Sequence, residues 1–184
     1  MRWVMPLLPL ILLVACGGDG IAKPSSSPTY EEFISPRLGY RIETPEEWTI
    51  EEDSLESNGE SYPVDGFMSP LGEQDFPANV NLTSRSALGR TFDAIIAMER
   101  VTMRENWEDV REDELVVAGH EAVIFHYSFE TYGTSYEGEF SPVDFSKVFV
   151  VIDDVEWEMW LTTSLGDRDR YMPIFEHMYN SFRP

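Results

Sequence analysis

Two long runs of β-branched and aromatic residues, at positions 143–152 and 155–163, are separated only by Asp153 and Asp154. Residues of these types favour strands, and two turn-forming residues between such runs indicate a β-hairpin. A third run, at positions 122–129, carries apolar side chains on both of its alternating sets of positions. A strand that is apolar on both sides belongs to a sheet with both faces covered. These segments therefore predict a sheet with a packed layer on each side.

Alternating apolar and polar residues predict further strands at positions 38–44, 78–84 and 115–118. Pro45 ends the first of them, because proline has no N–H to donate to a ladder. We expect positions 48–52 to form the partner strand of 38–44.

The connections between these strands differ in composition. Positions 53–63 are acidic and contain Gly and Ser, which predicts a loop, and positions 64–69 form a short apolar segment that Pro70 ends. Positions 132–141 are aromatic, acidic and Gly-containing, and we expect them to form an exposed connection.

Two helices complete the predicted elements. Thr91 is a favourable N-cap for a helix that runs to about residue 107. Its apolar stripe consists of Phe92, Ile95, Ile96, Met103 and Trp107. Glu99 falls within that stripe; it is either a functional carboxylate or, as we expect, a side chain that reaches water or an arginine. The last helix spans about 169–182, with Pro173 expected in its first turn.

Many strands joined by short hairpins, with one inserted and one terminal helix, indicate an α+β domain over residues 30–184. The motifs resemble those of the PsbP-like family: Gly39-Tyr40-x-Ile42-x-x-Pro45-x-x-Trp48, Leu115-x-Val117-x-Gly119-x-x-Ala122 and the ending Asn180-Ser181-Phe182-Arg183. The resemblance implies an α/β/α sandwich around a mostly antiparallel sheet, as in PsbP, small eukaryotic Ran-binding proteins and DcrB-type bacterial lipoproteins. Relatives of this fold differ in function, and no residue here matches a photosystem-docking or metal site of PsbP.

Residues 1–15 read as a lipoprotein signal peptide. Their apolar run from residue 3 to residue 15 is shorter than the ~20 residues that a membrane-spanning helix needs. The run ends in Leu13-Val14-Ala15-Cys16, which matches a bacterial lipobox, and Cys16 is the only cysteine. We expect its thiol to carry diacylglycerol; the alternative is an ordinary signal peptide and a stray thiol. Residues 16–29, rich in Gly, Ser and Pro, then form a flexible tether.

These features predict a protein of the bacterial cell envelope, anchored by lipid to the outer face of the cytoplasmic membrane or to the outer membrane. The chain carries a formal net charge of −21. Phosphate backbones repel such a surface, so nucleic acid is excluded as a partner. Anionic headgroups repel it too, and attachment therefore depends on the acyl chains.

The sequence contains no Gly-x-Ser-x-Gly elbow, no phosphate-binding Gly-rich loop and no His-Glu-x-x-His motif. We interpret His120, His126 and His177 as ordinary surface or hydrogen-bonded histidines. The one metal hypothesis is a calcium site in the acidic segment. The alternative is that this segment is a solvated acidic loop without a metal. The oxygen ligands would be Asp53, Glu56, Asn58 and Glu60, whose spacing does not fit an EF-hand.

The sequence therefore predicts a non-enzymatic binding or assembly module without a cofactor. Its expected working surface is a sheet rim or groove near Trp48 or in the 132–141 segment. One alternative is a carrier or sensor of a small apolar ligand held between sheet and helix, suggested by the many aromatic residues. A hydrolase that uses two unrecognised carboxylates is the other alternative. The partner remains an envelope protein of unknown identity.

Overall fold

The computed structural model describes residues 28–57, 60–70, 77–133 and 140–184. The elements follow in chain order: β1 (Tyr30–Ile34), β2 (Arg41–Pro45), β3 (Thr49–Ser57), β4 (Glu60–Met68), β5 (Asn79–Ser86), α1 (Phe92–Asn106), β6 (Arg111–Val117), β7 (His120–Gly133), β8 (Phe140–Ile152), β9 (Val155–Ser164) and α2 (Arg168–Ser181). Strands β3 to β9 form one seven-stranded sheet in the order β3-β4-β5-β9-β8-β7-β6, and all of its neighbours are antiparallel. The predicted α+β class with an antiparallel sheet is confirmed.

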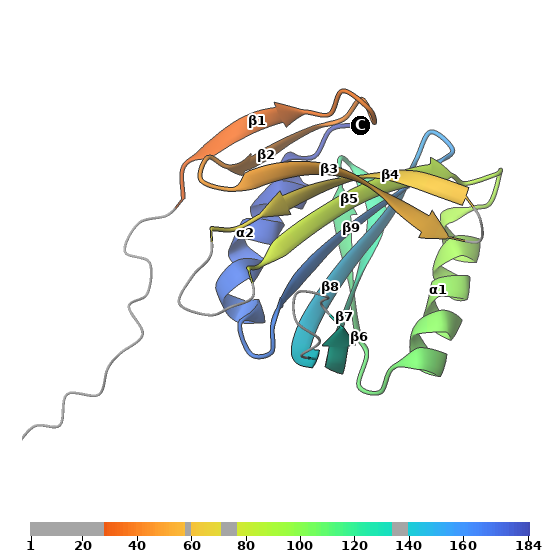
Figure 1. Cartoon of the computed structure of the whole chain (residues 1–184). Coiled ribbons are helices and arrows are strands. Elements are labelled where there is room, and N and C mark those ends of the chain that lie inside the picture. The colour runs from red at the N-terminus through yellow and green to blue at the C-terminus, as the bar shows by residue number, and fades with distance from the viewer. Residues whose placement is uncertain (1–27, 58–59, 71–76, 134–139) are drawn as a thin grey trace, which may run out of the picture.

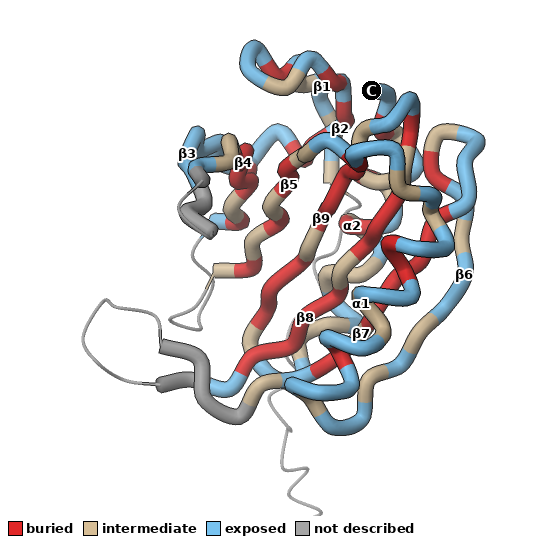
Figure 2. The backbone as a smooth tube through the Cα atoms, turned by 90° about the vertical axis from the view of Figure 1, so that its right-hand side faces the viewer, coloured by how far each residue is buried: buried red, intermediate tan, exposed pale blue. Residues whose placement is uncertain are grey.

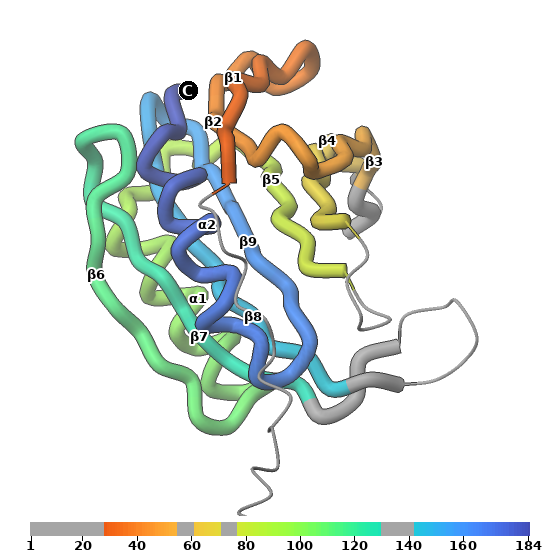
Figure 3. Tube along the Cα trace, turned by 90° about the vertical axis from the view of Figure 1, so that its left-hand side faces the viewer, coloured from red at the N-terminus to blue at the C-terminus, as the bar shows by residue number. Residues whose placement is uncertain are grey.

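The sheet has a layer on each face (Figure 1). Helix α2 and the separate two-stranded sheet β1-β2 cover one face, which we call the α2 face, and Figure 3 shows them from that side. Helix α1 covers part of the other, which we call the α1 face. Within the described residues, no helix is long and apolar enough to cross a membrane.

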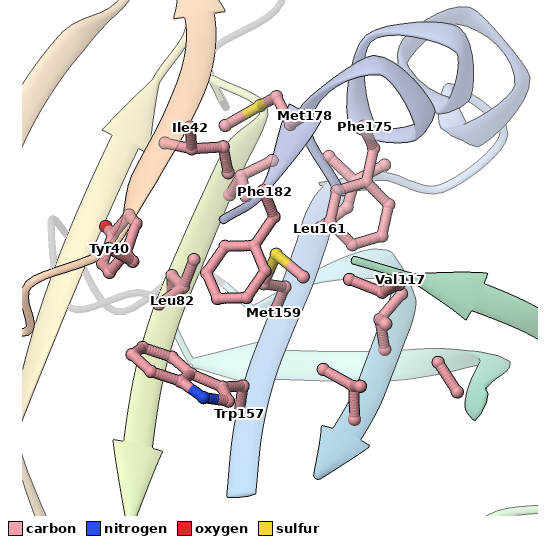
Figure 4. Close-up of a cluster of buried hydrophobic side chains, with 14 of the residues drawn as sticks. Tyr40, Ile42, Leu82, Val117, Trp157, Met159, Leu161, Phe175, Met178 and Phe182 are labelled. Carbon is pink, nitrogen blue, oxygen red and sulfur yellow. The ribbon is translucent and has the colours of Figure 1, made fainter. Parts of the chain in front are cut away.

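The larger core lies on the α2 face (Figure 4). It contains Tyr40 just before β2, Ile42 from β2, Met159 and Leu161 from β9, and Phe175 and Met178 from α2. Phe182, two residues from the chain end, is fully buried between Trp157 and Tyr40, with ring centroids 5.1 Å and 5.6 Å away. The chain end is therefore part of the core.

The second core, on the α1 face, is smaller. Ile96 and Met103 of α1 pack on aromatic and branched residues of β7 and β8, among them Phe125 and Phe149. In Figure 2, α1 lies in front of the β7–β6 side, whereas no helix crosses β3, β4 and β5. Among the described residues, therefore, no layer covers the part of the α1 face that β3, β4 and β5 form.

Local signals explain where several elements begin and end. The Thr91 side chain accepts a hydrogen bond from the Ala94 backbone N–H at 3.3 Å, which caps α1 as predicted. Asp153 and Asp154 both have positive φ, 51° and 63°, and join β8 to β9 in the manner of a type I′ turn. The predicted hairpin at these residues is confirmed.

The predicted loop at positions 53–63 is wrong. Most of it belongs to the β3-β4 hairpin, whose register runs from Thr49↔Met68 to Ser57↔Glu60, and the apolar segment 64–69 continues β4. The acidic composition of β3 favours a loop prediction, but β3 is an edge strand, and edge strands tolerate and even favour charged side chains.

The predicted pairing of residues 48–52 with 38–44 is also wrong. The partner of β2 is β1, a strand that the sequence did not indicate, and β3 pairs with β4 instead. Leu38 lies in the turn before β2 rather than in a strand. Its apolar side chain reflects packing against the core of the α2 face.

Two smaller expectations also need correction. Pro173 lies inside α2, beyond its first turn, because the helix starts at Arg168. Much of the expected 132–141 connection is strand: Tyr132 pairs with Ser141 and Gly133 with Phe140, while residues 134–139 lie outside the described part of the chain.

Candidate binding site on the uncovered half of the sheet

The uncovered half of the α1 face forms an open hollow of about 350 Å³. Because side chains alternate along a strand, every second residue of β3, β4, β5 and β9 points into it. The lining residues are Glu51, Asp53, Ser54, Val64, Gly66, Met68, Asn79, Asn81 and Trp160. Acidic and amide side chains share the lining of the hollow with Val64 and Met68, and one indole ring lies at its β9 side.

Gly66 in β4 has no side chain to fill the hollow. A Cβ at this position would lie 3.2 Å from Oδ1 of Asn81, a contact tighter than side chains normally make. The Asn81 side chain is itself held, since its Nδ2 donates to Oδ1 of Asn79 at 2.7 Å. These residues leave the Asn79 and Asn81 amide groups partly exposed, where a larger side chain at position 66 would fill the space.

A cluster of six charged residues separates the hollow from α1. It consists of Arg85, Arg90, Glu99, Lys147, Glu156 and Glu158, which we call the charge cluster. Arg85 Nη2 lies 2.6 Å from Glu156, 3.1 Å from Glu158 and 3.6 Å from Glu99. Arg90 adds a contact of 3.3 Å to the fully buried Glu156. A smaller hollow of about 220 Å³ opens onto this cluster between α1 and β5.

Lys147 shows how this surface holds a cation. Its ammonium lies 2.5 Å from Glu158 and over the Phe149 ring, 4.5 Å from the ring centroid. The Trp160 ring is 5.8 Å away. A carboxylate beside aromatic faces attracts ammonium and guanidinium groups by charge and by cation–π interaction.

Glu99 meets an arginine, which confirms the interpretation preferred from the sequence. Burial raises the pKa of its carboxyl, and the nearby Glu158 and Glu156 act in the same direction against Lys147 and Arg85. Because the folded-state pKa is raised, the fold favours the protonated Glu99 carboxyl over the ionised one. The stabilisation from the protonated carboxyl is complete below the unfolded-state pKa and is lost as pH rises through the raised folded-state pKa.

Glu99→Gln should therefore leave the protein at least as stable as the parent at pH 7, since Arg85 keeps Glu156 and Glu158. The difference between the two proteins should vanish below pH ~4, where the glutamate is protonated in both states. Urea unfolding across this pH range measures it. A variant that is much less stable at pH 7 would contradict the expectation.

Another hollow, of about 430 Å³, lies on the other flank of α1, between that helix and the edge strand β6. Its wall includes Phe92, Ile96 and Val123, and charged residues such as Arg100 and Glu114 stand at its rim. Arg100 is bound by Glu112 in a two-pronged contact, Nε to Oε1 at 2.9 Å and to Oε2 at 3.0 Å. The expected space between sheet and helix therefore exists as an open groove.

Ser146, His126 and Asp113 resemble a hydrolytic triad in composition. His126 Nδ1 lies 2.8 Å from Ser146 Oγ, and its Nε2 lies 3.9 Å from Asp113. Ser146 is fully buried, however, so no substrate carbonyl reaches its hydroxyl. The arrangement joins β6, β7 and β8 and carries no chemistry.

His126 should make stability fall in mild acid. Burial lowers its pKa, and Arg168 and Arg111 lower it further, although Asp113 opposes them. Because the folded-state pKa is depressed, stability is complete above the unfolded value of about 6.5 and is lost as pH falls below it. His126→Asn should flatten this slope in thermal unfolding at successive pH values, while a control at the exposed His120 should keep it. An unchanged slope in the His126 variant would count against this assignment.

The other residues singled out by sequence lie elsewhere. Cys16 lies outside the described residues, as does Asn58. Asp53 is an exposed residue of β3, not of a loop. His177 stacks on Tyr30 at 3.7 Å and contacts Glu43 at 2.6 Å, which fastens β1 and β2 to α2. Within the described part of the chain, no three His, Cys, Asp or Glu residues are grouped so as to hold a metal ion.

The expected working surface near the Trp48 end of the sheet stays a prediction, but it does not include the Trp48 ring. Trp48 is 6% exposed and packs against Tyr171 in the core of the α2 face, so it offers no binding surface. The sequence reasoning missed the charge cluster instead. A signal was present, because Glu156, Glu158 and Trp160 share one side of a strand whose other side is apolar.

Solved structures with the same fold were found, although no family model and no curated protein matches the sequence. Protein PA94 of Pseudomonas aeruginosa, of unknown function, is 16% identical over 84% of this chain and 96% of its own, with a TM-score of 0.55. The yeast (Saccharomyces cerevisiae) Ran-binding protein Mog1p is 9% identical over 85% and 96%, with a TM-score of 0.54. The cyanobacterial PsbP of Synechocystis sp. PCC 6803 is 14% identical over 93% and 98%, with a TM-score of 0.52. At these identities the likenesses show a PsbP-like fold.

Proposed function

We propose that this chain is a lipid-anchored, non-enzymatic binding module of the bacterial cell envelope, which holds a protein partner on the uncovered half of its α1 face. The observation that carries the proposal is the missing layer itself. Helix α2 and the β1-β2 sheet close the other face, whereas β3, β4 and β5 lie open beside α1. An open sheet face with a hollow and a charged border suits a macromolecular partner.

The same fold is found in a protein whose name describes it as Ran-binding, so a PsbP-like scaffold can hold a protein partner. The floor of this surface is rigid at β5 and β9, because β5 pairs with β9 over its whole length and β9 pairs with β8 over its whole length. A rigid surface loses little conformational entropy when it binds, which favours recognition of a partner without rearrangement.

A photo-crosslinking amino acid tests the site. Placed at Asn79, in the hollow, it should yield one adduct in cells, and sequencing of the adduct should identify the partner segment. The same amino acid at Glu31, an exposed residue of β1 outside the α1 face, is the matched control. Adducts that form only at Glu31 would overturn the location of the site.

The anchor is tested separately at Cys16, the only thiol in the chain. Thiol alkylation by diacylglycerol requires the sulfur as nucleophile. We expect Cys16→Ser to move the protein from the membrane to the soluble fraction and to abolish labelling by a fatty acid analogue. Continued labelling of the serine variant would contradict lipidation at this position.

The groove between α1 and β6 favours a second function, the transport or sensing of a small apolar ligand. Its volume of about 430 Å³ falls within the range of small-molecule sites, and Phe92, Ile96 and Val123 give it an apolar wall. Native mass spectrometry of the protein purified without added ligand would reveal a bound molecule. An empty protein would remove this candidate.

A further inference from the structure

The outer side of α1 carries an exposed apolar stripe. Ala94, Ala97, Met98 and Val101 are spaced so that they share one side of the helix, opposite its buried contacts, and all four are exposed. Met98 is 56% and Val101 55% exposed, and Leu88 just before the helix is 80% exposed. These are three of the seven exposed large apolar side chains among the described residues. Such a concentration marks an interaction surface.

The hollow beside α1 carries uncompensated negative charge. Glu51 and Asp53 are both exposed, and neither carboxylate pairs with a cation among the described residues. Among the described residues, the Asp53 carboxylate accepts the backbone N–H of Ser54. The nearby Arg85 and Lys147 are already bound to the carboxylates of the charge cluster. No ion pair of the described residues neutralises the Glu51 and Asp53 carboxylates, so the hollow would attract a cationic group.

Contacts connect the stripe to the hollow through the charge cluster, whose arginine and lysine side chains are partly exposed and whose Glu156 and Glu158 are buried. Arg90 lies 3.8 Å from the Met98 sulfur and 3.3 Å from Glu156. Arg85 then joins Glu156 to Glu158, and Lys147 leads from Glu158 to the Trp160 ring. A single ligand segment that crosses this surface would meet apolar side chains first and acidic side chains next.

We propose that the partner segment is cationic and amphipathic: its apolar residues cover Met98 and Val101, and its lysines or arginines enter the hollow beside Glu51, Asp53 and Trp160. This inference rests on the proposed function and specifies the partner's chemistry. Charge complementarity favours it, because the chain carries a net charge of −21. The same charge disfavours a second copy of this chain as the occupant.

The test uses the mature full chain and a synthetic amphipathic helix of lysine and leucine as the probe, with affinity measured by calorimetry. The double variant Glu51→Gln, Asp53→Asn should bind the probe with an affinity at least about tenfold lower than the parent's, as expected for the loss of two complementary charges. The matched control is Glu31→Gln, Glu46→Gln, which removes the same net charge from exposed positions outside the α1 face. It should bind nearly as the parent does.

The apolar half of the proposal has its own variant. Met98→Ser, Val101→Ser changes only exposed side chains and should also weaken the probe, whereas a lysine and serine peptide should bind the parent poorly. Equal losses in the control pair would mean that binding follows net charge, and this would overturn the inference. Dimerisation of the parent that the serine variant abolishes would also overturn it, because a second copy would then occupy the stripe.

The crosslink at Asn79 separates this inference from the proposed function. If the captured segment is acidic or uncharged, the binding site remains and the inference falls. If Asn79 yields no adduct, the proposed function falls with it.

Discussion

Phe182→Ala should lower the free energy of unfolding by about 3–5 kcal/mol, although the residue lies at the chain end. Its ring is fully buried and packs against both Trp157 and Tyr40. Truncation leaves a cavity between α2, β9 and the segment before β2, and surrounding side chains collapse only partly into such a space. Urea unfolding, followed by tryptophan fluorescence, measures the change.

Phe92→Ala is the matched control for Phe182→Ala. Phe92 begins α1 and is only half-buried, so the same truncation removes less apolar area from the folded state. We expect a clearly smaller loss of stability. Equal losses in the two variants would argue that the chain end does not belong to the cooperative core.

Asp65→Ala should lower the free energy of unfolding by about 3 kcal/mol, because the carboxylate is fully buried and has two partners. Arg37 Nη2 donates to its Oδ1 at 2.8 Å, and the Tyr40 hydroxyl donates to its Oδ2 at 2.8 Å. Burial and the neighbouring Asp65 raise the pKa of Tyr40, so the phenol stays protonated and remains a donor. Without the carboxylate, the buried Tyr40 hydroxyl loses this acceptor and the Arg37 guanidinium loses its buried counter-charge.

Tyr40→Phe is the companion variant of Asp65→Ala. It removes one hydrogen bond but keeps the Arg37 contact and the ring packing, so we expect a loss of about 1 kcal/mol. Equilibrium unfolding of both variants at neutral pH gives the comparison. If Tyr40→Phe costs as much as Asp65→Ala, the arginine contributes nothing to the network.

These two predictions concern interactions that join distant parts of the chain. Asp65 and Arg37 are 28 positions apart, and no local pattern in either segment indicates the contact. Sequence reasoning took the neighbouring acidic residues as a loop because their composition is polar. The structure pairs them as β3 with β4, and Arg37 then reaches the backbone oxygens of Asp53 and Val64 as well as Asp65.

The candidate site shows the same division. Glu99 was recognised as unusual from its helical spacing, and its arginine partner was anticipated in kind. The identity of that partner, Arg85, was not, because Glu99 of α1 meets Arg85 of β5 only when the helix packs on the sheet. The Arg85 contact with Glu156, 71 positions away, likewise requires that β5 pair with β9. Local sequence patterns do not predict the uncovered half of the sheet either, because it depends on where α1 packs.

Local sequence signals predict most of the helices and strands of this protein. Alternation with a period of two marked β5, β7, β8 and β9, the apolar stripe marked α1, and Thr91 marked its start, because these signals depend on residues a few positions apart. The tertiary structure alone decided the strand order, the burial of Phe182, the charge cluster and the open half of the α1 face. Each of these depends on packing between segments far apart in the chain, where the free energy comes from the assembled core rather than from local preference.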